Sequence, residues 1–166
     1  MKMVTVKPQK PGHSVRLVEL PGGGRVLARG LGGMPAPMPA PEFGLYLLGH
    51  PLDRPSVYGR LLVGLRAWTP PWPHERIDWP DFAAPRQPAL AVHQLRQTLC
   101  RIERGERVEV ACGGGRGRTG TALAALAVLQ GSTVDDAITW IRSVHDGKAV
   151  ESRAQHRFLR TITPAR

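Results

Sequence analysis

One stretch of the chain is the most informative, Val108-Glu-Val-Ala-Cys112-Gly-Gly-Gly-Arg-Gly-Arg118-Thr119-Gly120. Its apolar beginning predicts a short buried strand over 108–112, and the apolar residues after the glycines predict a helix from about Thr119 to Gln130. The backbone N–H groups of the intervening loop can all turn inward, and the N-terminus of the helix adds partial positive charge. The sequence therefore predicts an anion-binding loop between a strand and a helix.

Two reactive side chains stand at the ends of this loop. Cys112 ends the predicted strand, and a sulfur surrounded by N–H groups and cations favours the thiolate, which is the nucleophilic form. Arg118 can bind two oxygens of a phosphate in a bidentate arrangement. A nucleophile and an oxyanion clamp on one loop are the groups needed for phosphoryl transfer through a cysteinyl-phosphate.

Two other phosphate-binding motifs overlap the same residues. The segment 115–120 reads G-x-G-x-x-G, but no strand ending in an acidic residue follows at the distance that a dinucleotide-binding unit needs. A Walker A loop would need glycine at position 112 and lysine at position 118. Neither motif therefore explains the stretch.

A second motif, Trp79-Pro80-Asp81, precedes this stretch in the chain. Together with Ala111-Cys112-x5-Arg118-Thr-Gly it resembles the protein tyrosine phosphatase superfamily, whose acid loop carries Trp-Pro-Asp and whose signature is His-Cys-x5-Arg-Ser/Thr-Gly. A third block, 150–158, resembles the family's glutamine-bearing loop and the helix after it. The resemblance runs from about residue 76 to the C-terminus, and the size is similar to the compact dual-specificity branch.

The resemblance implies a role for each matching residue. Cys112 would attack phosphorus, Asp81 would protonate the leaving oxygen and later accept a proton from water, and Thr119 would stabilise the departing sulfur. Trp79 would anchor a closing acid loop made of Trp79, Pro80 and Asp81. No metal and no cofactor is expected. The residues expected to bind the phosphate are Gly113, Gly114, Gly115, Arg116, Gly117 and Arg118.

Three departures from the family pattern are visible. Ala111 stands where the family usually has a histidine that supports the loop and the thiolate, so its absence would slow turnover. Glu151 stands where the best-known tyrosine phosphatases have glutamine; it either positions water or is a solvated surface residue, and Gln155 could share the first role. There is no counterpart of the tyrosine-bearing loop, since Tyr46 and Tyr58 are interpreted as structural.

The substrate class stays open at this level. Phosphotyrosine in proteins is the first hypothesis, with phosphoserine and phosphothreonine as further substrates, because the acid loop resembles the tyrosine-specific branch. Arg116 either points to solvent or attracts multiply charged substrates, which would favour phosphoinositides or inositol phosphates. A non-catalytic pseudophosphatase that binds phosphorylated partners is the third hypothesis, and Ala111 is its support.

The composition adds limits to these hypotheses. The chain has 166 residues and a formal net charge of +10, which favours anionic partners, and no motif predicts an obligatory nucleic acid partner. We expect a basic flexible arm at 1–14 and a single catalytic domain at 15–166. Two cysteines and no apolar run of membrane-spanning length indicate a cytoplasmic protein, and the oligomeric state is left open.

The remaining pattern predicts an α/β fold of three layers, with a central, mostly parallel sheet of four or five strands and helices on both sides. A hairpin is expected from 15–20 and 25–31 around Pro21-Gly-Gly-Gly24. Cys100 is interpreted as a small buried side chain of the helix 88–104. Further strands are expected at 43–48, 61–65 and 76–79, and further helices after Thr133 and at 151–162.

Overall fold

The computed structural model describes residues 15–32, 37, 39–49 and 70–164, in which five strands form one sheet. The strands are β1 (Arg16–Glu19), β2 (Arg25–Gly30), β3 (Phe43–Leu47), β4 (His74–Ile77) and β5 (Val108–Cys112). Their order is β1-β2-β5-β3-β4, with β1 antiparallel to β2 and the other pairs parallel. The helices in these ranges are α2 (Pro88–Glu103), α3 (Gly117–Leu129), α4 (Val134–Val144) and α5 (Arg153–Arg160).

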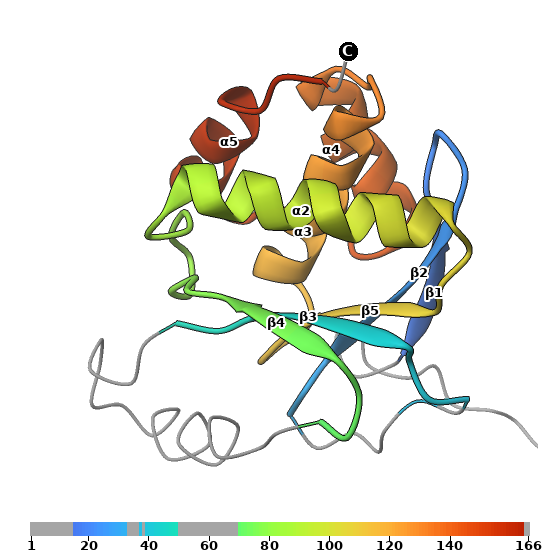
Figure 1. The fold of residues 1–166 in the computed structure, drawn as a ribbon. Helices are drawn as coiled ribbons and strands as arrows, with labels where there is room; N and C mark the ends of the chain where they lie inside the picture. Colours follow the sequence, from blue (N-terminus) through green and yellow to red (C-terminus); the bar gives the residue numbers. More distant parts are fainter. Residues whose placement is uncertain (1–14, 33–36, 38, 50–69, 165–166) are drawn as a thin grey trace, which may run out of the picture.

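The predicted α/β class with a mostly parallel sheet is confirmed, as is the hairpin of β1 and β2. The four described helices lie over one face of the sheet (Figure 1). Helix cover of the other face is not tested by the described residues. The expected arm at 1–14 and the expected strand at 61–65 lie outside these residues.

Helix α3 is the centre of the core, because all 13 of its residues are buried. After Arg118 the helix contains no charged residue and is rich in alanine and leucine, so every side of it can be packed against other parts of the protein. The helix follows directly from the loop after β5, the middle strand of the sheet. Because the carboxyl ends of parallel strands share one edge, this loop and the segment after β4 come together at that edge.

The main differences from the sequence-based expectation concern three element boundaries and one side chain. Strand β4 occupies 74–77 instead of 76–79, because its parallel pairing with β3 ends at Ile77. Helix α3 begins at Gly117, and α5 begins after the capping residue Ser152. The prediction that Cys100 is buried was wrong. Cys100 is exposed, because the buried face of α2 consists of Ala91, Leu95, Thr98, Leu99 and Ile102. No helix within the described ranges has the length and apolar character needed to cross a membrane.

Candidate active site

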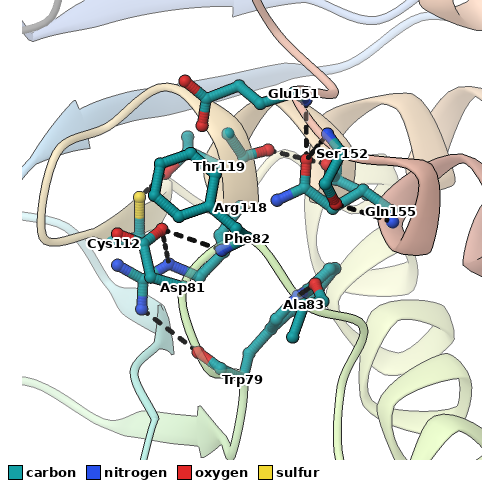
Figure 2. A network of polar contacts seen from close by, with 12 residues as sticks. Trp79, Asp81, Phe82, Ala83, Cys112, Arg118, Thr119, Glu151, Ser152 and Gln155 are labelled. Atoms are coloured by element: carbon teal, nitrogen blue, oxygen red, sulfur yellow. Dashed lines mark hydrogen bonds and ion pairs between the residues drawn. The ribbon is translucent and has the colours of Figure 1, made fainter. Parts of the chain in front are cut away.

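The Cys112 sulfur lies at the carboxyl end of β5, where the side chain is only 2% exposed. Two donors point at it. The Gly115 N–H and the Thr119 hydroxyl each donate a hydrogen bond to Sγ over 3.1 Å (Figure 2). The loop therefore curls around the sulfur, with donor groups directed at the atom that carries negative charge in a thiolate.

The N-terminus of α3 has no side-chain cap. Its N-cap residue, Arg116, makes no side-chain capping bond, and the first turn holds no acidic residue. By contrast, Thr133 caps α4 and Ser152 caps α5 through side-chain oxygens. An uncapped helix N-terminus presents N–H groups and partial positive charge, which is the arrangement that binds phosphate.

Arg118 joins the loop to the segment after β4. Its side chain is buried, and Nη1 donates a hydrogen bond to the Trp79 carbonyl oxygen over 3.1 Å. Its Nε lies 3.4 Å from Oδ1 of Asp81, whose carboxylate is 57% exposed. The acid loop predicted from Trp79-Pro80-Asp81 thus lies against the predicted phosphate loop, although the two are distant in sequence (Figure 2).

The acid loop has a buried anchor and an exposed tip. The Trp79 ring is fully buried, contacts Phe158 edge-on at 5.2 Å between centroids, and donates from Nε1 to the Ala83 carbonyl over 2.7 Å. Phe82 is 59% exposed and has a φ of 58°, a conformation that costs a non-glycine residue backbone strain. Its N–H donates to Oδ1 of Asp81 over 3.1 Å, which holds the carboxylate in place.

Glu151 and Gln155 lie at the start of α5, next to the loop. The Gln155 side-chain oxygen accepts from the N–H groups of Glu151 and Ser152, over 2.7 and 3.2 Å, as part of a capping box. Its buried Nε2 has no hydrogen-bond partner among the described residues and faces Gly117. Figure 2 shows the Glu151 side chain extending from α5 toward Phe82 and Cys112. Glu151 is exposed as a residue, but partial desolvation of its carboxyl group, and secondly the charge of Asp81, raise its pKa.

Two residues that sequence reasoning missed, His145 and Asp146, reach the loop from the end of α4. His145 Nε2 is 2.7 Å from the Gly115 carbonyl oxygen, and Oδ2 of Asp146 accepts a hydrogen bond from Arg116 Nε over 2.9 Å. Arg116 is therefore paired, and its side chain is 34% exposed. No motif marks this pair; the only sequence signal is two polar residues at the end of an apolar helical pattern.

The alanine in the family's histidine position lies on the opposite face of β5 from Cys112. Ala111 is buried with Leu31, Tyr46 and Leu48 in a small apolar cluster. The interpretation of Tyr46 as structural agrees with its position, because it is fully buried and accepts a hydrogen bond from Trp72 over 2.8 Å. Burial also raises the pKa of Tyr46, so its hydroxyl stays protonated. The second tyrosine, Tyr58, lies outside the described residues.

Gly115→Ala is expected to lower the free energy of unfolding by about 2 to 5 kcal/mol, from backbone strain and overpacking together. Gly115 has a φ of 73°, and a Cβ there would contact the backbone of Gly30 and lie 2.7 Å from the carbonyl carbon of Arg29. Urea denaturation measures the change. Gly147→Ala is the control, because nothing lies within 4 Å of a Cβ at that glycine. Equal stability of the two variants would contradict the tight packing of the loop on β2.

Comparison with known proteins gives this geometry a family. The model described as "Swiss Army Knife protein, DSP-PTPase phosphatase domain" matches residues 73–165, which is more than half of the chain and includes the acid loop, the phosphate loop and the start of α5. No curated protein matches in sequence.

Solved structures agree with the fold. The chain resembles Tk-PTP in its active form with 26% identity and a TM-score of 0.60, over 84% of this chain and 92% of that one. It also resembles kinase associated phosphatase with a serine in place of the catalytic cysteine, at 13% identity, a TM-score of 0.64, and 92% and 94% coverage. A third likeness is the human tyrosine phosphatase-like serine/threonine/tyrosine-interacting protein, at 11% identity, a TM-score of 0.63, and 87% and 93% coverage.

Proposed function

Because the chain belongs to the DSP-PTPase phosphatase domains of the protein tyrosine phosphatase superfamily, we propose that it hydrolyses phosphotyrosine in proteins through a cysteinyl-phosphate intermediate. The observation that carries this proposal is the position of the Cys112 sulfur. It lies at the uncapped N-terminus of α3, with the paired side chains of Arg118 and Asp81 beside the loop. Nucleophile, anion site and acid are then within one constellation.

In the first step, the Cys112 thiolate forms a bond to phosphorus while the bond from phosphorus to the substrate oxygen breaks. The leaving oxygen takes its proton from Asp81. The phosphoryl oxygens are held by the N–H groups of 113–118 and by the Arg118 guanidinium, which can rotate its donors from the Trp79 carbonyl to the phosphate. Trp79 and Pro80 anchor the acid loop.

In the second step, water attacks phosphorus, Asp81 accepts its proton, and the bond to sulfur breaks. The Thr119 hydroxyl, 3.1 Å from Sγ, stabilises the sulfur as it regains negative charge. Glu151 and Gln155 are proposed to position this water. The Gln155 oxygen already accepts two backbone hydrogen bonds, so its unpartnered Nε2 is the group available to the water.

The charges around the loop favour a singly phosphorylated protein over a phosphoinositide or an inositol phosphate. Asp146 pairs with Arg116, which removes the additional cation that a polyphosphate would need. Glu151 adds a carboxyl group next to Asp81, and its negative charge would repel further phosphate groups. The exposed Phe82 ring beside Asp81 offers an apolar surface for an aromatic substrate side chain.

The proposal also covers the domain and its location. The catalytic domain is proposed to extend over 15–166, with a basic arm at 1–14. A reducing compartment such as the cytoplasm would keep the Cys112 thiol available, since the nucleophile must stay out of a disulfide.

The test compares hydrolysis of a phosphotyrosine peptide, the same peptide with phosphoserine, and an inositol polyphosphate. We expect the highest kcat/KM on the phosphotyrosine peptide. Phe82→Ala should lower this value about fivefold and leave the phosphoserine value unchanged, since an aromatic contact contributes about 1 kcal/mol. Leu90→Ala is the control, because this exposed apolar side chain lies on α2.

Two outcomes would contradict the proposal. A higher kcat/KM on the inositol polyphosphate than on either peptide would mean that the substrate is an inositol phosphate or a phosphoinositide and not a phosphorylated protein. If the wild type binds inorganic phosphate but hydrolyses none of the three substrates, the non-catalytic phosphate-binding hypothesis would be correct instead.

A further inference from the structure

The carbonyl group of Gly115 is held by a side chain from a distant part of the chain. His145 follows α4, is 7% exposed, and places Nε2 2.7 Å from the Gly115 oxygen. A carbonyl oxygen only accepts hydrogen bonds, so the proton of this bond belongs to Nε2. His145 is therefore a fixed donor to the backbone of the candidate phosphate loop.

This bond fixes the orientation of one peptide unit. The C=O and N–H groups of a planar trans peptide point in opposite directions, so the Gly115 carbonyl directed at His145 turns the N–H of Arg116 the other way. The N–H of Gly115 is itself directed at the Cys112 sulfur. Two consecutive N–H groups of the loop are thus set by contacts on either side of Gly115.

Asp146, the residue after His145, holds the side chain of Arg116. Oδ2 of Asp146 accepts from Arg116 Nε over 2.9 Å, and its Oδ1 accepts from the Lys148 N–H over 2.8 Å. Asp146 is 9% exposed, so this pair lies largely out of solvent. Both the backbone and the side chain of Arg116 are therefore held at the end of α4.

We propose that His145 is a positioning residue, which holds the Gly115–Arg116 peptide so that the Arg116 N–H faces a bound phosphate. This inference rests on the proposed function of the loop. Ala111, which stands in the family's histidine position, cannot do the same, because it carries no polar group and is packed among apolar residues on the other face of the sheet. Without the donor, the Gly115 carbonyl could turn inward and repel the anion.

The environment of His145 keeps the imidazole neutral. Burial lowers the pKa of His145 below the ordinary value of 6.5, and the positive charge of Arg16 on β1 lowers it further. The hydrogen bond to the Gly115 carbonyl and the negative charge of Asp146 both act in the opposite direction. Nδ1 is buried and has no hydrogen-bond partner within the described residues, so a proton there would be unpaired. Because the pKa of His145 is lower in the folded than in the unfolded chain, the folded state binds fewer protons as the pH falls. The contribution of His145 to the free energy of unfolding is therefore fully present above the pKa of the unfolded chain and decreases as the pH falls below that pKa.

The experiment measures how well inorganic phosphate protects Cys112 from alkylation by iodoacetamide, together with kcat/KM for an aryl phosphate. His145→Leu keeps the apolar bulk without a donor. We expect it to weaken phosphate binding and lower kcat/KM by about tenfold to a hundredfold, the range for losing one hydrogen bond to a charged ligand site. His145→Gln offers an amide N–H near the Nε2 position and should lie within about threefold of the wild type by the same measure.

The control is His93→Leu, which makes the same change at an exposed position of α2 and should alter neither readout. Unchanged phosphate protection in His145→Leu would overturn the inference, as would equal losses in the Leu and Gln variants. If His145→Leu does not fold, His145→Gln decides alone: it should keep phosphate binding and lose less stability than the wild type between about pH 7 and pH 5. A weakly binding Gln variant overturns the inference.

Failure of the proposed function would look different. If the wild type is protected by phosphate but hydrolyses no aryl phosphate, the catalytic proposal fails, while the protection series still tests His145. If phosphate does not protect the wild type at all, both proposals are overturned.

Discussion

Cys112→Ser is expected to abolish hydrolysis, with kcat lowered by about 10⁴-fold or more, as when other enzymes lose their nucleophile. A serine hydroxyl must lose its proton to attack phosphorus. Two groups form hydrogen bonds with the Cys112 sulfur, the Gly115 N–H and the Thr119 hydroxyl. Both act as donors, so neither is placed to accept the proton of a serine hydroxyl. Serine is nearly the same size as cysteine, and the loop should keep its shape and its affinity for inorganic phosphate.

The matched control is Cys100→Ser, which makes the same change at the exposed cysteine of α2 and should leave kcat unchanged. Rapid acid quenching during turnover, followed by mass spectrometry, should find the phosphoryl group on the peptide that contains Cys112. Full activity in Cys112→Ser, or a phosphoryl group on any other residue, would mean that the nucleophile is a different side chain.

The arrangement of strand, loop and helix around the candidate phosphate loop could be predicted from the sequence because its parts are adjacent in the chain. A buried strand, a run of glycines and an apolar helix define their own geometry, and α3 follows β5 with only four residues between them. The acid loop was found through the Trp79-Pro80-Asp81 motif, and the structure brings it to Arg118. The strand of that motif was shifted by two residues, because strand ends depend on pairing with β3 and not on local propensity.

The contacts of His145 and Asp146 could not be predicted, since they depend on how α4 packs against α3. Both residues contact the loop across 30 positions of the chain, and neither belongs to a motif. The pairing of Arg116 with Asp146 was likewise not among the two roles considered for Arg116 from the sequence. The role of Gln155 could be predicted only in part. The block 150–158 marks Gln155 as a candidate site residue, but the sequence does not reveal that its amide oxygen caps α5.

Asp81→Asn is expected to lower kcat/KM for phenyl phosphate by about 10²- to 10⁴-fold, the range of general-acid catalysis. Asparagine keeps the size of the side chain and can still accept the hydrogen bond from the Phe82 N–H, so the acid loop should stay in place. It cannot give a proton to the phenolate oxygen that leaves. The loss therefore belongs to the chemical step, and binding of inorganic phosphate should not weaken.

The dependence on the leaving group separates this role from a structural one. Dinitrophenolate is a weak base and leaves without protonation, so Asp81→Asn should hydrolyse dinitrophenyl phosphate at nearly the rate of the wild type. Asp135→Asn makes the same change at an exposed position in the first turn of α4 and should affect neither substrate. Equal losses on both aryl phosphates would contradict the acid role. They would mean that Asp81 acts through Arg118, whose Nε lies 3.4 Å from its carboxylate, because a misplaced guanidinium would impair every phosphate ester alike.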